Sequence, residues 1–419
     1  LLIGANPRKD QPLINLRLRQ AALKGARVFA INPVDYDFNY RLAGRVIASP
    51  ADMVRALAGV ARALSTLKKT ELPAAFVKHF RDAKPGVTEQ AMAEALQQSA
   101  RASVLLGGAA LSHPQAASLR ALAQLVADLC GAKLGQLPEG NSAGAWLAGC
   151  VPHRGSSGKS AAAGRHALDM LRDPLKAYLL LGVEPELDCL DGAAAGAAMR
   201  AAEFVVMLTT FKPSPYRTGA VDYANVWLPL APFTETDGMF VNVAGRCQKF
   251  SAAVAPLGET RPGWKILRML GHLLGLSGFE QASVDDVRGE MNLPDVSAAS
   301  ASFPFTVTPA AAATTAAAGQ LMRLAEVPIY AVDAIVRRAP ALQKTADNPK
   351  PAAHVNAAQA DKLGLMAGDA VQVVAPHGAA RLDLVIDARV PDACVLVPAG
   401  YPETAMLGGH GPVTVRADS

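Results

Sequence analysis

The loop at residues 155–160 has the composition of a phosphate-binding loop. Its sequence, Gly155-Ser156-Ser157-Gly158-Lys159-Ser160, ends in the Gly-Lys-Ser that can surround a nucleotide phosphate with backbone N–H groups and a lysine ammonium. That chemistry also needs a glycine five positions before Gly158 and a strand that leads directly into the loop. The required position holds His153, and no strand pattern precedes it. We therefore interpret the segment as a surface loop and not as a site of nucleotide hydrolysis.

Cysteine and histidine are the next candidates, because they could ligate a metal. Cys150 and His153 have the spacing of half a zinc site, but no second pair lies nearby in the sequence. The chain has five cysteines, none in a Cys-x-x-Cys pair: Cys130, Cys150, Cys189, Cys247 and Cys394. An iron-sulfur cluster needs grouped cysteines, so we predict neither a metal ion nor a cluster in this chain. Scattered, odd-numbered cysteines also favour reduced thiols in a cytoplasmic compartment.

Glu235 and Asp237 form a carboxylate pair that could perform acid–base chemistry if their environments separated their pKa values. The pair stands beside Gly238, where acidic side chains commonly accept hydrogen bonds from the backbone of a turn. We favour this structural role. No Ser-His-Asp or Cys-His arrangement has a local signature, and we predict no catalytic residue in the chain.

The segment Gly4-Ala5-Asn6-Pro7-Arg8 follows an apolar run, Leu1 to Gly4, that is typical of a buried strand. In open α/β sheets, ligands bind at the carboxyl ends of the strands, so this segment predicts a dinucleotide-shaped crevice. A Gly-x-Gly-x-x-Gly motif is absent, which argues against an ordinary NAD site. Because the first strand begins at residue 1, we expect preceding chain in the longer protein and exposed apolar surface along this strand.

Short apolar strands alternate with helices over most of the chain, which predicts parallel sheets wound by helical crossovers. Gly25 lies where the C-cap of a first helix belongs, and Ser49-Pro50-Ala51-Asp52 predicts the N-terminus of another. The predicted strands are 1–4, 26–31, 103–106, 177–182, 204–209 and 224–228, and the predicted helices include 12–24, 88–100 and 114–130.

Beyond this α/β region the composition changes twice. Residues 297–320 are rich in Ala, Ser, Thr and Pro and predict a linker. Strand patterns at 369–375, 379–386 and 394–397 then predict a small antiparallel barrel. The expected division is a first lobe at 1–84, a second, inserted lobe at 85–232, a hairpin with helices returning to the first lobe at 233–296, a linker at 297–345 and the barrel at 346–419.

The overall composition excludes several classes of protein. With 419 residues, 51% of them hydrophobic and 18% charged, the chain can bury two or three cores and is not disordered. The net charge of +5 is scattered, without a basic tract or an aromatic stripe, so nucleic-acid binding is disfavoured. Apolar runs such as 177–183 are too short to span a membrane.

Several segments resemble motifs of the molybdopterin oxidoreductase superfamily. They are the opening Gly4-Ala5-Asn6-Pro7, the segment 223–229 (YANVWLP), the segment 235–248 (ETDGMFVNVAGRCQ), and 364–371 (GLMAGDAV), which resembles the start of the superfamily's dinucleotide-binding barrel. Two positions depart from the pattern: Asn225 replaces an acid in the second motif and Ala244 one in the third. The resemblance implies interleaved parallel-sheet α/β lobes of molybdopterin-oxidoreductase type, followed by a small C-terminal β-barrel.

Four further segments resemble the large cluster-bearing subunit of bacterial respiratory complex I, the proton-translocating NADH:quinone oxidoreductase. They are Asn6-Pro7-Arg8-Lys9, Pro152-His153-Arg154, 180–186 (LLGVEPE) and 261–265 (RPGWK). This resemblance implies the structural C-terminal part of that subunit, inactive alone. It would support electron transfer from NADH to quinone, with [2Fe-2S] and [4Fe-4S] clusters in an upstream region of the same polypeptide.

The same resemblance implies the surroundings of the protein. The expected partners are other subunits of the peripheral arm of complex I, including the flavin-bearing NADH-oxidising subunit, at the cytoplasmic face of the bacterial inner membrane. Molybdopterin is expected to be absent, which leaves a vestigial, empty pterin-dinucleotide crevice near Gly4, Asn6 and Pro7. The alternative is a fragment of an active molybdenum bis-pterin enzyme, such as a formate dehydrogenase or nitrate reductase, in which Asn6 and the barrel grip the cofactor.

Overall fold

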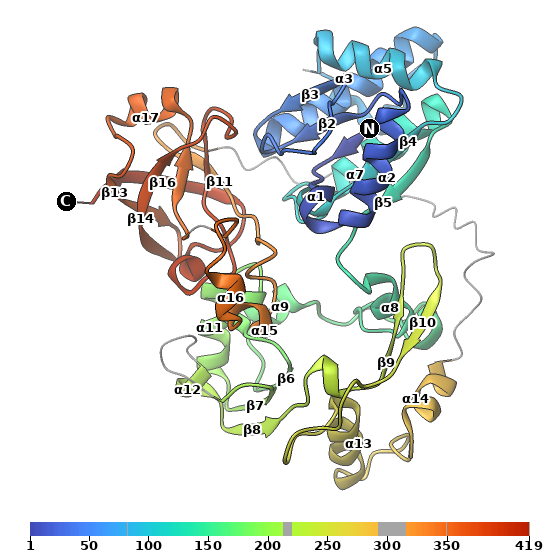
Figure 1. The fold of residues 1–419 in the computed structure, drawn as a ribbon, viewed down its shortest axis with the longest axis vertical. Helices are drawn as coiled ribbons and strands as arrows, with labels where there is room; N and C mark the ends of the chain where they lie inside the picture. Colours follow the sequence, from blue (N-terminus) through green and yellow to red (C-terminus); the bar gives the residue numbers. More distant parts are fainter. Residues whose placement is uncertain (82, 213–219, 292–315, 349, 419) are drawn as a thin grey trace. The chain divides into compact units, whose positions relative to one another are not determined.

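The computed structural model describes the chain except residues 82, 213–219, 292–315, 349 and 419 (Figure 1). The chain divides into two compact units. Among the described residues, the first contains those of 1–139, 316–330 and 344–418, and the second contains those of 140–291 and 331–343. The first unit combines an α/β lobe with a closed barrel, so the α/β fold class and the C-terminal barrel are confirmed.

The lobe of the first unit is built on a five-stranded parallel sheet with the order β3-β2-β1-β4-β5. Its strands are β1 (Leu2–Ile3), β2 (Phe29–Asn32), β3 (Gly44–Ile47), β4 (Ser103–Leu106) and β5 (Lys133–Gln136). Strand β1 pairs with β2 on one side and with β4 on the other, with Ile3 opposite both Ile31 and Leu106. The expectation of an exposed edge at the first strand is therefore wrong, because β1 is central and buried.

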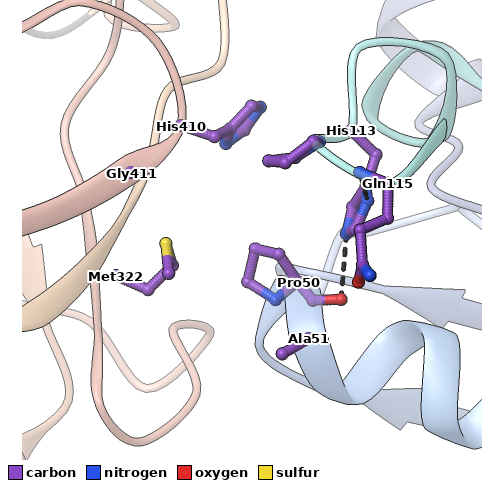
Figure 2. A pocket seen from close by; sticks show the side chains of 8 residues that line it. Pro50, Ala51, His113, Gln115, Met322, His410 and Gly411 are labelled. Atoms are coloured by element: carbon purple, nitrogen blue, oxygen red, sulfur yellow. Dashed lines mark hydrogen bonds between the residues drawn. The ribbon is translucent and has the colours of Figure 1, made fainter. Parts of the chain in front are cut away.

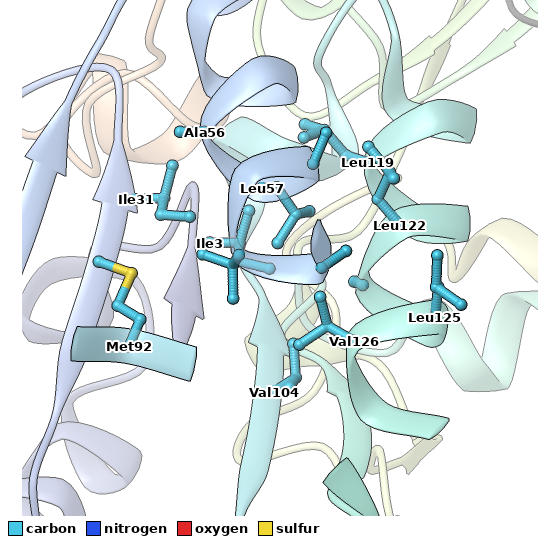
Figure 3. Packing of buried hydrophobic residues seen from close by; sticks show 14 of the residues in the cluster. Ile3, Ile31, Ala56, Leu57, Met92, Val104, Leu119, Leu122, Leu125 and Val126 are labelled. Atoms are coloured by element: carbon cyan, nitrogen blue, oxygen red, sulfur yellow. The ribbon is translucent and has the colours of Figure 1, made fainter. Parts of the chain in front are cut away.

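Helices cover both faces of this sheet. They are α1 (Pro7–Asp10), α2 (Pro12–Leu23), α3 (Pro50–Lys68), α4 (Val77–Phe80), α5 (Val87–Gln98), α6 (Gly108–Leu111) and α7 (Ala116–Cys130). Side chains of α3, α5 and α7 pack on one face around Ile3 and Ile31, and Figure 3 shows this core. On the other face Leu2 packs with Ile14 and Leu18 of α2.

The predicted N-cap of α3 at Ser49 is confirmed, whereas the C-cap of α2 is Lys24, one residue before the predicted Gly25. The Ser49 hydroxyl accepts the N–H of Asp52 at 3.3 Å and donates to its carboxylate at 2.6 Å, which closes the first turn of α3. Gly25 follows α2 with a φ of +95°, a conformation that an L side chain rarely adopts.

The C-terminal part of the first unit is a closed six-stranded barrel with the order β11-β15-β12-β14-β13-β16. Its elements are β11 (Leu321–Leu324), β12 (Ala353–Val355), α17 (Ala357–Leu363), β13 (Ala370–Ala375), β14 (Gly378–Ile386), β15 (Cys394–Leu396) and β16 (Gly411–Ala417). The predicted antiparallel barrel needs correction, because β11 pairs with β15, and β12 with β14, in parallel. Alternate residues of β14, such as Leu382 and Leu384, point into the barrel core.

The second unit contains a three-stranded parallel sheet with the order β6-β7-β8, formed by Ala177–Leu181, Phe204–Thr209 and Val226–Pro229. An antiparallel hairpin, β9 (Gly238–Val241) and β10 (Cys247–Phe250), follows it. The helices are α8 (Ser142–Leu147), α9 (Ala167–Arg172), α10 (Pro185–Asp188), α11 (Gly192–Ala201), α12 (Ala220–Tyr223), α13 (Gly263–Leu273), α14 (Val284–Met291), α15 (Ala334–Arg337) and α16 (Pro340–Gln343).

The observed division differs from the expected one at three points. The first lobe extends past residue 84, because β4 and β5 complete its sheet. The hairpin at 238–250 belongs to the second unit. Within the expected linker at 297–345, residues 297–315 lie outside the described residues, while 321–324 form β11 of the barrel.

Candidate functional site

The order of strands reverses at β1 in the first unit. The chain passes from β1 to β2 and β3 on one side, and then returns to β4 and β5 on the other. The segments that leave the carboxyl ends of β1 and β4 therefore diverge, and such a switch point is where open α/β sheets form ligand crevices. The predicted site residues Gly4, Asn6 and Pro7 all lie in the segment that follows β1.

Gly4 has a packing role at this point. Its φ is +56°, and a Cβ atom added to it would lie 2.3 Å from the backbone nitrogen of Ala110. Its N–H donates to Ile31 O at 2.8 Å, and its carbonyl oxygen accepts the N–H of Ala109 at 3.0 Å. Gly4 thus allows the segment after β4 to approach β1, and its backbone polar groups are already used within the chain.

Asn6 presents the polar side chain closest in sequence to the end of β1. Its carbonyl oxygen accepts the N–H groups of Lys9 and Asp10, both at 3.0 Å, so the backbone of Asn6 starts α1. Its carboxamide makes no hydrogen bond to any described residue. Pro7 is buried as the first residue of α1, where its missing N–H costs nothing. The free carboxamide of Asn6 can therefore bind a polar ligand.

Two cations of α1 lie directly after Asn6. Arg8 pairs with Asp37, and Lys9 pairs with Asp347, which also accepts the hydroxyl of Tyr330 at 2.9 Å. The carboxylate side chains are 72% and 56% exposed, and such surface pairs contribute only about 0–1 kcal/mol. A polyanion could displace these carboxylates at small cost. The sequence motif includes Arg8 and Lys9, but it does not reveal their partners Asp37 and Asp347.

Glu326 is an acidic residue near this site that no sequence pattern singled out. It follows β11, is partly buried, and accepts the hydroxyl of Tyr36 from the α/β lobe. Burial raises the pKa of Glu326 to about 8, and the charge of Asp10 contributes to this rise. Glu326 is therefore largely protonated at pH 7 and adds little negative charge to the region of Arg8 and Lys9.

A small cavity of about 20 Å³ lies elsewhere in the first unit, lined by Pro50, Met322 and two histidines (Figure 2). His113 Nδ1 accepts the N–H of Gln115 at 2.8 Å, so its Nε2 carries the proton and donates to Pro50 O at 2.9 Å. His410 accepts the N–H of Ala325 at 3.1 Å. Burial lowers the pKa of both histidines, that of His410 to about 4. The cavity holds about one water molecule and is not a cofactor crevice.

The glycine-rich loop at 155–160 follows helix α8 and packs on Trp146. A Cβ atom at Gly158 would lie 2.5 Å from the Trp146 ring, and the Arg154 guanidinium lies 4.5 Å from the ring centroid. The Ser157 hydroxyl donates to Met291 O at 2.5 Å. Without an incoming strand, this segment lacks the architecture of a phosphate-binding loop.

Cys150 and His153 are both exposed in the structure. Within the described residues, no three side chains of His, Cys, Asp or Glu are grouped so that they could hold a metal ion. Cys130, Cys189 and Cys394 are half-buried or buried, and burial raises the pKa of each of their thiols.

The predicted structural role of Glu235 and Asp237 is confirmed. Glu235 accepts the N–H of Leu257 at 2.9 Å, and Asp237 accepts the N–H of Ala252 at 3.0 Å. Gly238, however, is not in a turn. It begins β9 opposite Phe250, whose ring would lie 2.3 Å from an added Cβ atom.

Comparisons with known proteins agree with this geometry. Residues 1–273 match the family model "Molybdopterin oxidoreductase", and residues 328–417 match the "Molydopterin dinucleotide binding domain". The acetylene hydratase from Pelobacter acetylenicus has a similar fold, with a TM-score of 0.66 at 15% sequence identity. The match covers 98% of this chain and 73% of that protein.

Similarity to curated sequences is more local. Two proteins of Staphylococcus aureus, strains USA300 and NCTC 8325, are provisionally named formate dehydrogenases and are each 37% identical over 79 residues. The aligned stretch is 19% of this chain and spans only 8% of the length of either relative.

The expectation that molybdopterin is absent is wrong. Both matched family models describe molybdopterin proteins, and one describes the domain that binds the dinucleotide of the cofactor, so they point to a molybdopterin cofactor. The donors near β1 fit such a group, since a carboxamide and two cations suit the phosphates of a dinucleotide. No helix among the described residues is long and apolar enough to cross a membrane.

Proposed function

The chain belongs to the molybdopterin oxidoreductase family, and we propose that it is the part of a molybdenum enzyme that holds the pterin dinucleotide. The observation that carries this proposal is the switch point between β1 and β4. There Asn6, whose carboxamide is free, precedes α1, which carries Arg8 and Lys9 with exposed and displaceable carboxylate partners.

Each residue has a distinct task in this proposal. Asn6 would donate its amide N–H to the dinucleotide, while Arg8 and Lys9 would neutralise its phosphates. Gly4 keeps the segment after β4 close to β1. The side chain of Asn32 fixes the start of the loop, because its oxygen accepts the N–H of Ala5 at 2.9 Å and its amide donates to Ala5 O at 3.2 Å. The bound cofactor supplies the oxidation–reduction chemistry at its molybdenum.

The experiment is to purify the whole protein and to measure its molybdenum content and the fluorescence of its oxidised pterin. We expect stoichiometric molybdenum and pterin. Asn6→Ala and Arg8→Ala should each lower the retained pterin several-fold without lowering the melting temperature. Arg19→Ala, on the exposed side of α2, is the matched control and should retain the cofactor. A folded protein without pterin would overturn the proposal.

A second candidate is the C-terminal part of the large cluster-bearing polypeptide of complex I. It is supported by the segments that resemble that protein, one of which carries Glu184, the buried acid of an ion-pair cluster with Arg337 and Arg338. In this role the chain would support electron transfer from NADH to quinone beside the flavin-bearing subunit, at the cytoplasmic face of the inner membrane. Co-purification of a flavin-bearing NADH-oxidising protein with the tagged protein is expected for this candidate, and its absence would exclude it.

A further inference from the structure

The second unit contains a large open cavity that the proposed function does not use. Its volume is about 620 Å³, which falls in the range of roughly 300–1,000 Å³ that is usual for small-molecule sites. It lies beside α13 and next to the end of the three-stranded sheet. It is lined by Leu228, Arg261, Trp264, Lys265, Arg268 and Met269 among others.

Close packing fixes helix α13 at both ends. A Cβ atom at Gly263 would lie 3.0 Å from Leu181 Cδ1, so the first turn rests directly on the end of β6. A Cβ atom at Gly271 would lie 2.3 Å from the Phe279 ring. Helix α13 therefore forms one wall of the cavity, and its packing at both ends holds it in place. Such a fixed wall is typical of a preformed binding site.

Most of the lining is apolar. Leu228, Ile266 and Leu270 contribute aliphatic side chains, and Met269 lies at the exposed side of the helix with 45% of its surface accessible. A ligand with an apolar body would remove this surface from water, which favours binding.

The charged side chains of the lining are all cationic: Arg261, Lys265 and Arg268. Arg261 donates to Thr260 O at 2.7 Å, and the Lys265 ammonium lies 5.4 Å from the centroid of the Trp264 ring. Arg268 is partly buried, whereas Arg261 and Lys265 are exposed. The Nε of Arg268 is shut off from solvent and has no acceptor, and its guanidinium makes no ion pair with any described residue. A partly buried, uncompensated guanidinium is costly and is stabilised by an anion.

We propose that this cavity binds an amphiphilic anion, a molecule that joins one carboxylate, sulfonate or phosphate group to an apolar body. Arg268 binds the anionic group and Lys265 adds a second positive charge, while Leu228, Met269 and Leu270 contact the apolar body. The site is independent of the proposed pterin crevice, because all of its residues belong to the second unit.

The test is a calorimetric titration of the whole protein with decanoate, below the concentration at which decanoate forms micelles. Decanol and inorganic phosphate serve as probes of the apolar and anionic halves alone. We expect one saturable site for decanoate, and at least tenfold weaker binding of decanol and of phosphate. Equal binding of phosphate and decanoate would overturn the amphiphile assignment, and no saturable binding of decanoate would overturn the site.

Variants of the lining sharpen the test. Arg268→Gln should weaken decanoate binding at least tenfold, whereas Arg246→Gln, on the exposed turn of the hairpin, is the matched control and should leave it unchanged. If Arg268→Gln lowers the melting temperature, Lys265→Gln serves as the test variant instead, because Lys265 is exposed. Its affinity for decanoate should fall about threefold. Unchanged affinity in a folded Arg268→Gln protein would contradict the proposal.

Discussion

The five-stranded sheet of the first unit and the three-stranded sheet of the second are both parallel, yet they are covered very differently. In the first unit, Leu2 and Ile3 of the same strand are buried in cores on opposite faces. In the second unit, Tyr178 and Leu180 of β6 pack under α11, while Leu179 and Leu181 remain 51% and 45% exposed. Helices thus cover the first sheet on both faces, and apolar side chains of β6 stay accessible in the second.

The second unit has a smaller apolar cluster than the first and contains a buried polar cluster. Arg337 contacts Glu184 at 2.9 Å and Asp188 at 2.7 Å, and Arg338 contacts Glu184 at 2.5 Å and stacks on Phe211. These contacts attach the segment at 331–343 to α10, about 150 residues away in the sequence. Apolar burial therefore dominates the first unit, while a buried ionic cluster is a main attachment in the second.

The largest effect should follow from breaking this cluster. In Arg337→Met the carboxylates of Glu184 and Asp188 lose a buried cation, which should lower the free energy of unfolding of the second unit by about 3–5 kcal/mol. All three tryptophans lie in this unit, so denaturant unfolding followed by tryptophan fluorescence measures it selectively. Arg165→Met breaks an exposed pair with Asp173 and should cost less than about 1 kcal/mol. Equal losses in the two variants would contradict the difference between buried and exposed pairs.

The same leucine truncation should act differently in the two units. Leu57 is fully buried on α3, and Leu57→Ala should destabilise the first unit by about 3 kcal/mol, because it leaves a cavity in a packed core. Leu179→Ala on the exposed face of β6 should change the stability of the second unit by less than about 0.5 kcal/mol. Circular dichroism and tryptophan fluorescence during unfolding compare the two. A large loss for Leu179→Ala would mean that its face of the sheet is covered.

Acidification should weaken the two units over different pH ranges. The folded pKa of His410 is about 4 against an ordinary value of 6.5, so its stabilising contribution is complete above pH 6.5 and is lost as the pH falls toward 4. Relative to His410→Gln, the wild-type first unit should lose about 2 kcal/mol between pH 7 and pH 5. The wild type is compared with His410→Gln because Glu326, whose pKa is raised, increases the stability of the first unit as the pH falls and so opposes the effect of His410.

In the second unit the arginines hold the pKa of Glu184 below its ordinary value of 4.5 despite burial, so that contribution is lost only as the pH falls below about 4.5. The stability of the second unit, followed by tryptophan fluorescence, should therefore change little between pH 7 and pH 5. A His410→Gln variant with the wild-type pH dependence would refute the assignment in the first unit.

The smallest effect concerns thiol reactivity, without a change in stability. Cys150 and Cys247 are exposed and both lie in the second unit, whereas burial raises the pKa of Cys394 to about 12. Labelling the native protein with a chromogenic disulfide should modify two of the five thiols quickly and the other three slowly. Unfolded protein should react at all five. A fast reaction of Cys394 would indicate that the barrel core opens.

The sequence predicted elements with a clear apolar pattern better than elements without one. Strand β7 has the predicted bounds Phe204–Thr209, and the cap at Ser49 is confirmed, because both depend on neighbouring residues alone. The strands β3 and β5 were missed because their residues lack an apolar run: Lys133–Gln136 contains Leu134 as its one large apolar residue, whereas β4, of the same length, has Val104, Leu105 and Leu106 in a row. Their pairing with the rest of the sheet decides their conformation.

The candidate site was predictable only in part. The motif Gly4-Ala5-Asn6-Pro7 placed it after β1, because strand ends and helix starts are local. Glu326 approaches Tyr36 across 290 residues of sequence, and Lys9 approaches Asp347 across 338. No spacing rule reveals such pairs.

The sequence by itself determined the α/β character, the barrel, the N-cap of α3 and the motifs of the family. Tertiary structure decided that β1 is central, that Gly4 packs against Ala110, and that Arg268 lines a cavity without a counter-charge among the described residues. The physical reason is that backbone conformation follows from neighbouring residues, whereas burial and charge pairing follow from which distant segments the packed core brings together.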